Sequence, residues 1–180
     1  MPRDHRYVQL KFSLALSVCL ALVLNASLYK GQTQPHPELN KDVILTVDGE
    51  VEHSLKLTLG DLQGLTRLKS RVKDPDGTEA AFEGVPLIEI LRLAGAKVGE
   101  QLRGKNLVNY LVVKATDGYQ VVFALPELDP AFTDRLILLA DHRDQKPLAA
   151  AEGPLRIVVP DEKRRARWVR QVLSLTIRRA

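Results

Sequence analysis

The stretch Gly153-Pro154-Leu155-Arg156-Ile157-Val158-Val159-Pro160 is a short apolar run with proline near each end and a single arginine inside. A run of this length and composition predicts a β-strand, here over residues 155–159. Because side chains alternate along a strand, Arg156 and Val158 face the side opposite to their neighbours. A strand this apolar is typical of a sheet interior, so Arg156 is expected beside covered surface and with an anionic partner. That partner is either an acidic side chain of the same chain or a ligand.

A basic segment follows this strand. The residues Lys163-Arg164-Arg165-Ala166-Arg167-Trp168-Val169-Arg170 place five cations around the only tryptophan of the chain. If the segment is extended, Trp168 and Arg170 share a face, whereas one helical turn puts Arg167 and Arg170 together. In either conformation an arginine close to Arg156 gives two guanidinium groups suited to a phosphate. The alternative is a solvated basic turn that holds no ligand.

Turn signals elsewhere predict an α+β domain, mostly antiparallel or mixed β-sheet with short helices. Asp48-Gly49 and Asp117-Gly118 are typical of β-hairpin turns, and Asp74-Pro75-Asp76-Gly77 is a further turn signal. From the residues alone, Asp117-Gly118-Tyr119 is therefore a hairpin turn. Strands are predicted at 43–47, 51–57, 69–73, 78–82, 110–115, 119–124, 136–140, 155–159 and 172–177.

Two helices are predicted. A capping box of Thr58 and Asp61 indicates a short helix over 58–65. A second helix is expected over 86–94, because Pro86 suits a first helical position and Gly95 a C-cap. Its apolar side chains recur at helical spacing and should form one buried face. They are Leu87, Ile90, Leu91 and Ala94.

The first 30 residues predict an export signal. Residues 1–11 are basic, residues 12–28 are apolar, and Leu24-Asn25-Ala26 offers a small-residue cleavage site. The apolar run is slightly long for a signal peptide and slightly short for a membrane span of ~20 residues. Residues 1–30 are therefore predicted as a signal peptide or a signal anchor, and 31–42 as a linker. The domain at 43–180 is expected in the periplasm, free or anchored through residues 12–28.

The charge distribution favours a local anion site over a nucleic-acid surface. The formal net charge is +4, but residues 1–30 carry four basic groups against one acid. Residues 156–180 carry eight basic groups against two acids, while 31–155 carry 14 against 19. A nearly neutral domain with one basic end is not typical of nucleic-acid binding. The expected partner is a small anionic ligand.

Several kinds of site are missing from the sequence. The only cysteine, Cys19, lies in the apolar N-terminal run, so the predicted domain has no thiol for a disulfide, a metal or nucleophilic catalysis. The four histidines have no metal-ligand spacing. Neither a nucleophile elbow nor a glycine-rich phosphate loop is present. No catalytic residue and no metal ligand are predicted.

Taken in order, these segments resemble the oxidoreductase molybdopterin-binding domain, the catalytic-domain fold of sulfite oxidase and related periplasmic reductases. The resemblance spans about residues 43–177. The motifs that carry it are Leu57-Thr58-Leu59, Phe82-Glu83-Gly84-Val85-Pro86-Leu87, Asp117-Gly118-Tyr119, Leu138-Leu139-Ala140-Asp141, Pro147-Leu148, Gly153 to Pro160 and Arg167 to Arg170.

The resemblance implies a mixed, largely β fold around a molybdopterin-type cofactor. In that family the arginine of the Gly-Pro-Leu-Arg strand and a cation of the closing segment hold the pterin phosphate. These positions fall on Arg156 and Arg170. The predicted cofactor-binding residues are Arg156, Arg170, Arg167, Lys163, Asp117, Gly118 and Tyr119.

The chain departs from the family at three places. The family's redox members ligate molybdenum through a cysteine that should fall near Ser70-Arg71-Val72. Ala151-Glu152 stands where a histidine-glycine pair is usual, so a carboxylate lies next to the expected phosphate site. Arg3 and Arg6 are not adjacent and form no twin-arginine signal. Ordinary sulfite-oxidase chemistry is therefore not expected.

Two functions remain open from the sequence. The first is an exported protein that binds a pterin cofactor or a similar phosphate-bearing ligand and serves redox chemistry with a membrane-bound or periplasmic partner. The second is an interaction module that keeps the fold without a cofactor and without catalysis. Fold similarity cannot decide between them, because function resides in the site.

Overall fold

A computed structural model describes residues 43–73 and 77–180 of the chain. The predicted signal segment and linker lie outside these residues, as does most of the predicted turn at 74–77. Within the described part, no helix is both long and apolar enough to cross a membrane.

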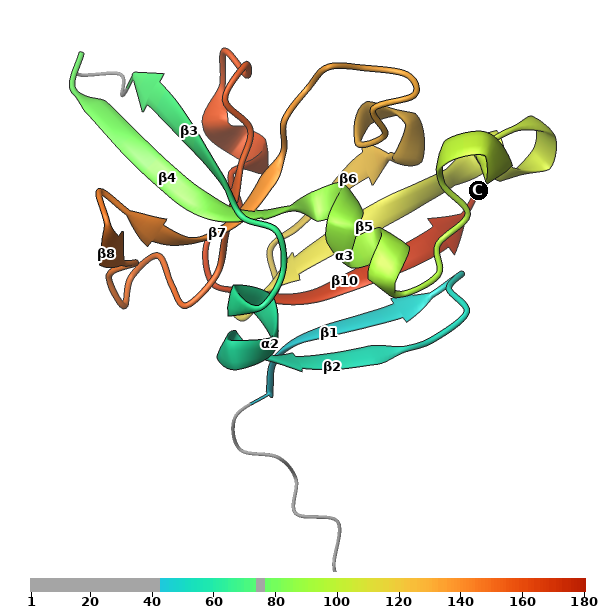
Figure 1. Cartoon of the computed structure of the whole chain (residues 1–180), viewed down its shortest axis with the longest axis horizontal. Helices are drawn as coiled ribbons and strands as arrows, with labels where there is room; N and C mark the ends of the chain where they lie inside the picture. Colours follow the sequence, from blue (N-terminus) through green and yellow to red (C-terminus); the bar gives the residue numbers. More distant parts are fainter. Residues whose placement is uncertain (1–42, 74–76) are drawn as a thin grey trace, which may run out of the picture. The chain divides into compact units, whose positions relative to one another are not determined.

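Two five-stranded groups of strands form the domain (Figure 1). The first sheet has the order β2-β1-β10-β5-β6, and only its β1–β10 pair is parallel. In the second sheet β3, β4, β7 and β8 follow one another, and β9 also pairs with β7. The strands are β1 (Val43–Gly49), β2 (Leu55–Thr58), β3 (Leu68–Lys73), β4 (Glu79–Pro86), β5 (Asn109–Ala115), β6 (Gln120–Ala124), β7 (Leu138–Arg143), β8 (Lys146–Pro147), β9 (Arg156–Val158) and β10 (Val172–Arg179).

The helices are short. Two are α-helical, α2 (Leu59–Gln63) and α3 (Leu87–Leu93). The 3-10 turns are η1 (Gly99–Gln101), η2 (Gly104–Val108), η3 (Leu125–Glu127) and η4 (Arg165–Arg167). This confirms the predicted α+β class, with antiparallel pairing dominant and helices confined to short connections.

Local sequence explains where both helices begin and end. The predicted capping box is present at α2, where the Thr58 hydroxyl accepts from the Asp61 amide and the Asp61 carboxylate accepts from the Thr58 amide. Gly95 follows α3 with a φ of +73°, the left-handed conformation that glycine tolerates. Pro86 differs from its predicted place, because β4 continues through it and the helix begins one residue later at Leu87.

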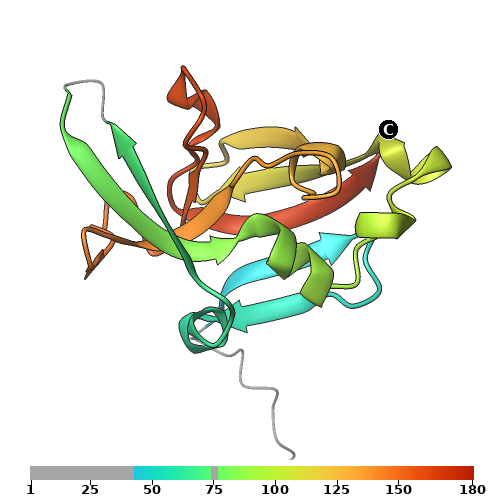
Figure 2. The same cartoon turned by 45° about the horizontal axis from the view of Figure 1, so that its top comes forward.

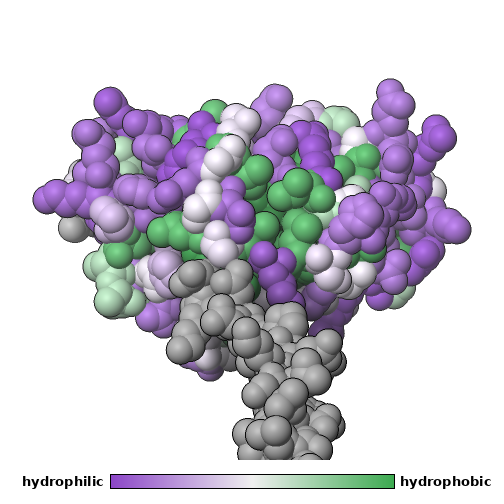
Figure 3. All heavy atoms as spheres, turned by 60° about the horizontal axis from the view of Figure 1, so that its bottom comes forward, coloured by the Kyte–Doolittle hydropathy of each residue, from purple (hydrophilic) through white to green (hydrophobic). Residues whose placement is uncertain are grey.

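The apolar face predicted for the second helix is confirmed, since each of its four side chains is fully buried. They join one core that also takes Phe82 from β4, Phe123 from β6 and Trp168. Figure 3 shows one face of the molecule, polar around its rim with apolar side chains gathered near its centre.

The second sheet projects a long β3–β4 hairpin away from the first sheet (Figures 1 and 2). The segment around η4 lies beside this hairpin, where Arg165 Nη2 donates to the Lys73 carbonyl oxygen at 2.8 Å. On its other side the segment leads into β10 of the first sheet. The basic segment singled out in the sequence therefore connects the two sheets.

Candidate functional site

A pocket of about 580 Å³ lies where the β5–β6 turn, β9 and the segment after η4 meet. Its volume falls in the range of roughly 300–1,000 Å³ that is usual for small-molecule sites. Three arginines and one carboxylate are among the lining residues. The lining residues are Ala115, Asp117, Tyr119, Ala151, Arg156, Arg165, Ala166, Trp168, Val169, Arg170 and Gln171.

Arg156 is the buried cation of this pocket, with only 9% of its surface exposed. Its Nη1 lies 2.7 Å from Oε1 of Glu152, while its Nε is buried and makes no hydrogen bond. Burial lowers the pKa of Arg156, Glu152 opposes that effect, and the nearby charges of Arg170 and Arg143 add to it. Of the two partners considered for this arginine, the internal carboxylate is present, and the pocket leaves room for a ligand beside it.

Two aromatic rings hold the Arg156 guanidinium. Its central carbon lies 5.4 Å from the ring centroids of both Phe82 and Trp168, which meet edge to face at 5.9 Å. Arg165 covers the Trp168 ring at 4.3 Å. The Trp168 Nε1 donates to the Val159 carbonyl oxygen at 2.9 Å, which fixes the indole. Such cation–π contacts favour a charged guanidinium in a position that solvent hardly reaches.

The β5–β6 turn closes one side of the pocket. The Asp117 carboxylate accepts from the Tyr119 amide at 2.9 Å, and Gly118 has a φ of +88°. The Tyr119 hydroxyl donates to the Ala166 carbonyl oxygen at 2.8 Å, which joins the turn to the segment after η4. Asp117 and Tyr119 line the pocket, whereas Gly118 supplies the backbone conformation of the turn.

Arg170 lines the same pocket as Trp168. Neither of the two conformations considered for this segment holds throughout, because residues 165–167 form the turn η4 and Arg170 lies in a bend. Arg170 is exposed, and within the described part of the chain no carboxylate forms an ion pair with it. The next residue, Gln171, has a φ of +51° and donates its amide to the Glu152 carbonyl oxygen at 2.9 Å. This bond ties Arg170 to the segment that precedes β9.

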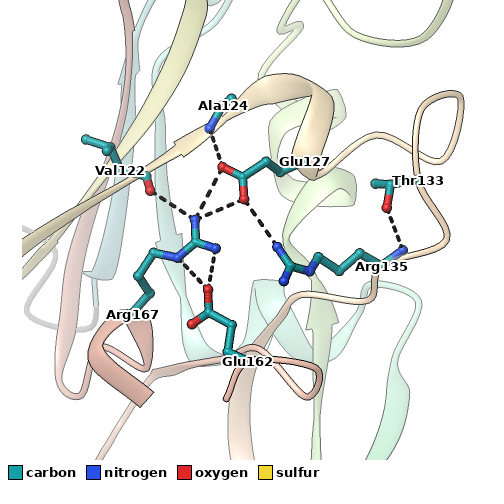
Figure 4. A network of polar contacts seen from close by, with 7 residues as sticks. All are labelled: Val122, Ala124, Glu127, Thr133, Arg135, Glu162 and Arg167. Carbon is teal, nitrogen blue, oxygen red and sulfur yellow. Dashed lines mark hydrogen bonds and ion pairs between the residues drawn. The ribbon is translucent and has the colours of Figure 1, made fainter. Parts of the chain in front are cut away.

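Arg167 and Lys163 do not reach the pocket. Arg167 lies between two carboxylates (Figure 4), with Nε 2.6 Å from Glu162 Oε1 and Nη1 3.0 Å from Glu127 Oε2. Glu127 also binds Arg135, and the Phe123 ring lies 4.4 Å from the Arg167 guanidinium. Lys163 is exposed and does not line the pocket. Arg167 thus anchors the segment through these two carboxylates, and it does not line the pocket that Arg170 lines.

Sequence patterns had not selected Arg165 and Gln171 as site residues. Arg165 belonged to the basic segment, but its stacking on Trp168 depends on the turn of η4. No sequence pattern indicated that Gln171 belongs to the site. Four long-range hydrogen bonds fix its position. The Thr116 hydroxyl and amide donate to its side-chain and backbone oxygens, its side-chain nitrogen donates to the Ala150 carbonyl oxygen, and its amide donates to the Glu152 carbonyl oxygen.

The residues present fit only one end of a molybdopterin cofactor. Arg156, with its unpartnered buried Nε, and Arg170 suit the phosphate. The metal end has no soft ligand, because the only cysteine is Cys19. The position implied for a cysteine falls within Ser70-Arg71-Val72 of β3, where Ser70 lies opposite Phe82 of β4. No group of three or more His, Cys, Asp or Glu side chains that suits a metal occurs among residues 43–73 and 77–180.

The fold is similar to that of the sulfane dehydrogenase SoxCD from Paracoccus pantotrophus. The TM-score is 0.58 and the sequence identity 22%, over 74% of this chain and 37% of that chain. This chain thus spans little more than a third of that chain's length. No protein-family model and no curated protein matches the sequence.

At this identity the likeness concerns the fold alone. It agrees with the sulfite-oxidase-like, molybdopterin-enzyme-like fold that the sequence motifs implied. The ligand, the reaction and the partners have to be inferred from the residues of the pocket and not from the fold.

Proposed function

We propose that this domain binds a pterin-type ligand, or a similar small molecule, through a phosphate group held by Arg156 and Arg170. The observation that carries the proposal is the pairing of these two arginines on one pocket. Arg156 is buried with an unused Nε–H, and Arg170 has no carboxylate partner among the described residues. A buried donor without an acceptor costs about 1–3 kcal/mol, so the Arg156 guanidinium is not fully satisfied by the protein alone.

The other pocket residues suit the rest of such a ligand. Tyr119 offers a half-exposed aromatic ring, and Asp117 a carboxylate that can accept from ring nitrogens. A molybdopterin cofactor, when bound, supplies redox chemistry at its metal. Because this chain offers the metal no thiolate, its own residues hold and orient an anion, and the proposal includes no redox step at a metal.

The setting of this function is also proposed. The basic and apolar pattern of residues 1–28 supports export to the periplasm, as a free or membrane-anchored protein. A periplasmic or membrane-bound redox protein is the proposed partner.

A second candidate function is an interaction module that keeps the fold without a cofactor. The observation that favours it is the Glu152–Arg156 ion pair, which satisfies part of the buried charge without any ligand. In that case Arg156 has a structural role in the core, and the pocket belongs to the fold without binding a ligand.

The full chain isolated from its native host separates the two functions. Released pterin would be measured by fluorescence and molybdenum by elemental analysis, with a thermal-shift titration of 6-hydroxymethylpterin phosphate beside them. We expect bound pterin or a ligand-dependent rise in Tm, without stoichiometric molybdenum. Absence of pterin together with an unchanged Tm would support the interaction module.

A further inference from the structure

The Glu152 carboxylate lies near two arginines, one of which is closer than the other. Its Oε1 is 2.7 Å from Arg156 Nη1 and 3.8 Å from Arg143 Nη1. Glu152 itself does not line the pocket, whereas its neighbour Ala151 does. One carboxylate oxygen thus has a near partner at the pocket and a second partner outside it.

We propose that Glu152 is an internal counter-anion of the phosphate site, which an incoming phosphate displaces from Arg156 and which Arg143 then receives. This inference rests on the proposed function, because it concerns the affinity of the same site. It assigns roles to Glu152 and Arg143, two residues that would not contact the ligand.

The backbone around Glu152 allows its side chain to move alone. The Glu152 amide donates to the Ala149 carbonyl oxygen at 2.8 Å, and its carbonyl oxygen accepts from Gln171 at 2.9 Å. These bonds hold the main chain in place, while 22% of the side chain is exposed. A carboxylate rotation between the two guanidinium groups therefore needs no rearrangement of β9.

Charge explains why the exchange is favourable only with a ligand. Arg156 is buried between Phe82 and Trp168, so it needs an anion beside it at all times. Glu152 fills that need in the absence of ligand. A phosphate brings more negative charge and several acceptor oxygens, and it can reach Arg156 and Arg170 together. Glu152 and the phosphate repel each other, so the carboxylate gains by moving to the more exposed Arg143.

Contacts with Phe82 and Asp144 position the Arg143 guanidinium near Glu152. Its guanidinium lies 5.5 Å from the Phe82 ring centroid, and Asp144 Oδ2 lies 3.6 Å from its Nε. The same Phe82 ring contacts Arg156 at 5.4 Å. The two arginines thus share one ring as well as one carboxylate.

The test is the affinity of the full chain for inorganic phosphate, followed by Trp168 fluorescence and by isothermal titration. Glu152→Gln removes the charge and keeps the shape, and it should tighten phosphate binding by about tenfold. Arg143→Gln should weaken binding by about threefold in the wild-type background, because Glu152 then stays on Arg156. In the Glu152→Gln background the Arg143 substitution should have almost no effect, an outcome that a purely structural role for Arg143 does not produce.

The outcomes separate this inference from the function on which it rests. If wild type binds phosphate and Glu152→Gln binds it equally or more weakly, with an unchanged Tm, the counter-anion role is wrong and the phosphate site stands. If Arg143→Gln weakens binding equally in both backgrounds, the exchange is wrong as well. If neither wild type nor Glu152→Gln binds inorganic phosphate or 6-hydroxymethylpterin phosphate, the proposed function itself fails.

Discussion

The guanidinium carbon of Arg156 lies 5.4 Å from the centroid of the Trp168 ring, and both residues line one pocket. They come from different segments, β9 and the stretch that follows η4. This contact makes the only tryptophan of the chain a reporter of the charge beside Arg156. It also means that whatever binds Arg156 binds next to the segment that carries Arg170.

Arg170→Gln should weaken phosphate binding by about tenfold, because one charge-assisted contact is lost at an exposed position. Stability should change by less than about 0.5 kcal/mol, since no described carboxylate pairs with this side chain. The measurement is a fluorescence titration with inorganic phosphate, with urea unfolding alongside. The matched control is Arg178→Gln, an exposed arginine that does not line the pocket. An equal loss of affinity in both variants would show only a general effect of charge.

Arg167→Gln should lower the free energy of unfolding and have a smaller effect on phosphate affinity. The substitution leaves Glu127 and Glu162 facing each other without the cation between them (Figure 4), which should cost about 2 kcal/mol. Adding Glu162→Gln should recover part of that loss, because the repulsion between the carboxylates disappears. Urea unfolding of the single and double variants measures both effects. Phosphate affinity should fall less than in Arg170→Gln, and the reverse order would place Arg167 in the binding site.

Asp141 makes part of the fold sensitive to acid. Burial would raise the pKa of this carboxyl, but hydrogen bonds from Arg67 and His142 outweigh burial and hold the pKa below its usual range. Arg67 binds it with both Nη atoms, at 3.1 and 2.5 Å. A carboxyl with a lowered folded pKa stabilises the fold above its unfolded pKa, and that contribution is lost as pH falls through the folded pKa.

Asp141→Asn should therefore cost about 3 kcal/mol at pH 7, because Arg67 loses its buried partner. The difference from wild type should begin to shrink as pH falls below about 4, where the carboxyl of the unfolded chain becomes protonated, and it should vanish only below the lower pKa of the folded carboxyl. Urea unfolding from pH 7 to pH 2.5 measures this trend, with Asp48→Asn as an exposed control. A difference that stays constant across the pH range would contradict the role given to the Asp141 charge.

Gly84 permits the close approach of β4 to β7. A Cβ atom at this position would lie 2.1 Å from the Leu139 carbonyl oxygen and 2.5 Å from the Ala140 Cα, both in the backbone. Gly84→Ala should cost at least about 3 kcal/mol, since neither strand can yield without breaking the sheet. Gly60→Ala is the matched control, because its nearest neighbour would be the Thr58 hydroxyl at 3.7 Å. That variant should be neutral or stabilising by up to about 1 kcal/mol.

Local patterns predicted much of the fold. The capping box of Thr58, the apolar face of α3 and the Asp117-Gly118 turn depend on residues close in sequence, and the structure has all three. The turn predicted at Asp48-Gly49 was wrong, because both residues extend β1 and pair with β10, and the connection to β2 follows at residues 50–54. Strand ends were less accurate: β7 runs over 138–143, three residues beyond the predicted end, because its ladder with β4 continues to Arg143. Pairing between distant strands cannot be read from the periodicity of one of them.

The site was only partly predictable for the same reason. Arg156 was expected to be buried with an anionic partner, and it is. The choice between Arg167 and Arg170 was open, because it depends on whether the segment is extended or helical. In the structure the turn η4 is followed by an irregular stretch through Arg170, and Arg167 contacts Glu127, 40 residues away in sequence. No local signal specifies that contact.

The central claim is that Arg156 and Arg170 form one phosphate site, and isothermal titration of the full chain with 6-hydroxymethylpterin phosphate tests it most directly. Unphosphorylated 6-hydroxymethylpterin and the Arg156→Gln variant serve as comparisons, with a Tm measurement to confirm that the variant folds. We predict saturable binding of the phosphorylated pterin to wild type, with at least about tenfold weaker binding when either the phosphate or the Arg156 charge is removed. Equal affinity for both pterins, or no binding by a folded wild-type protein, would contradict the claim.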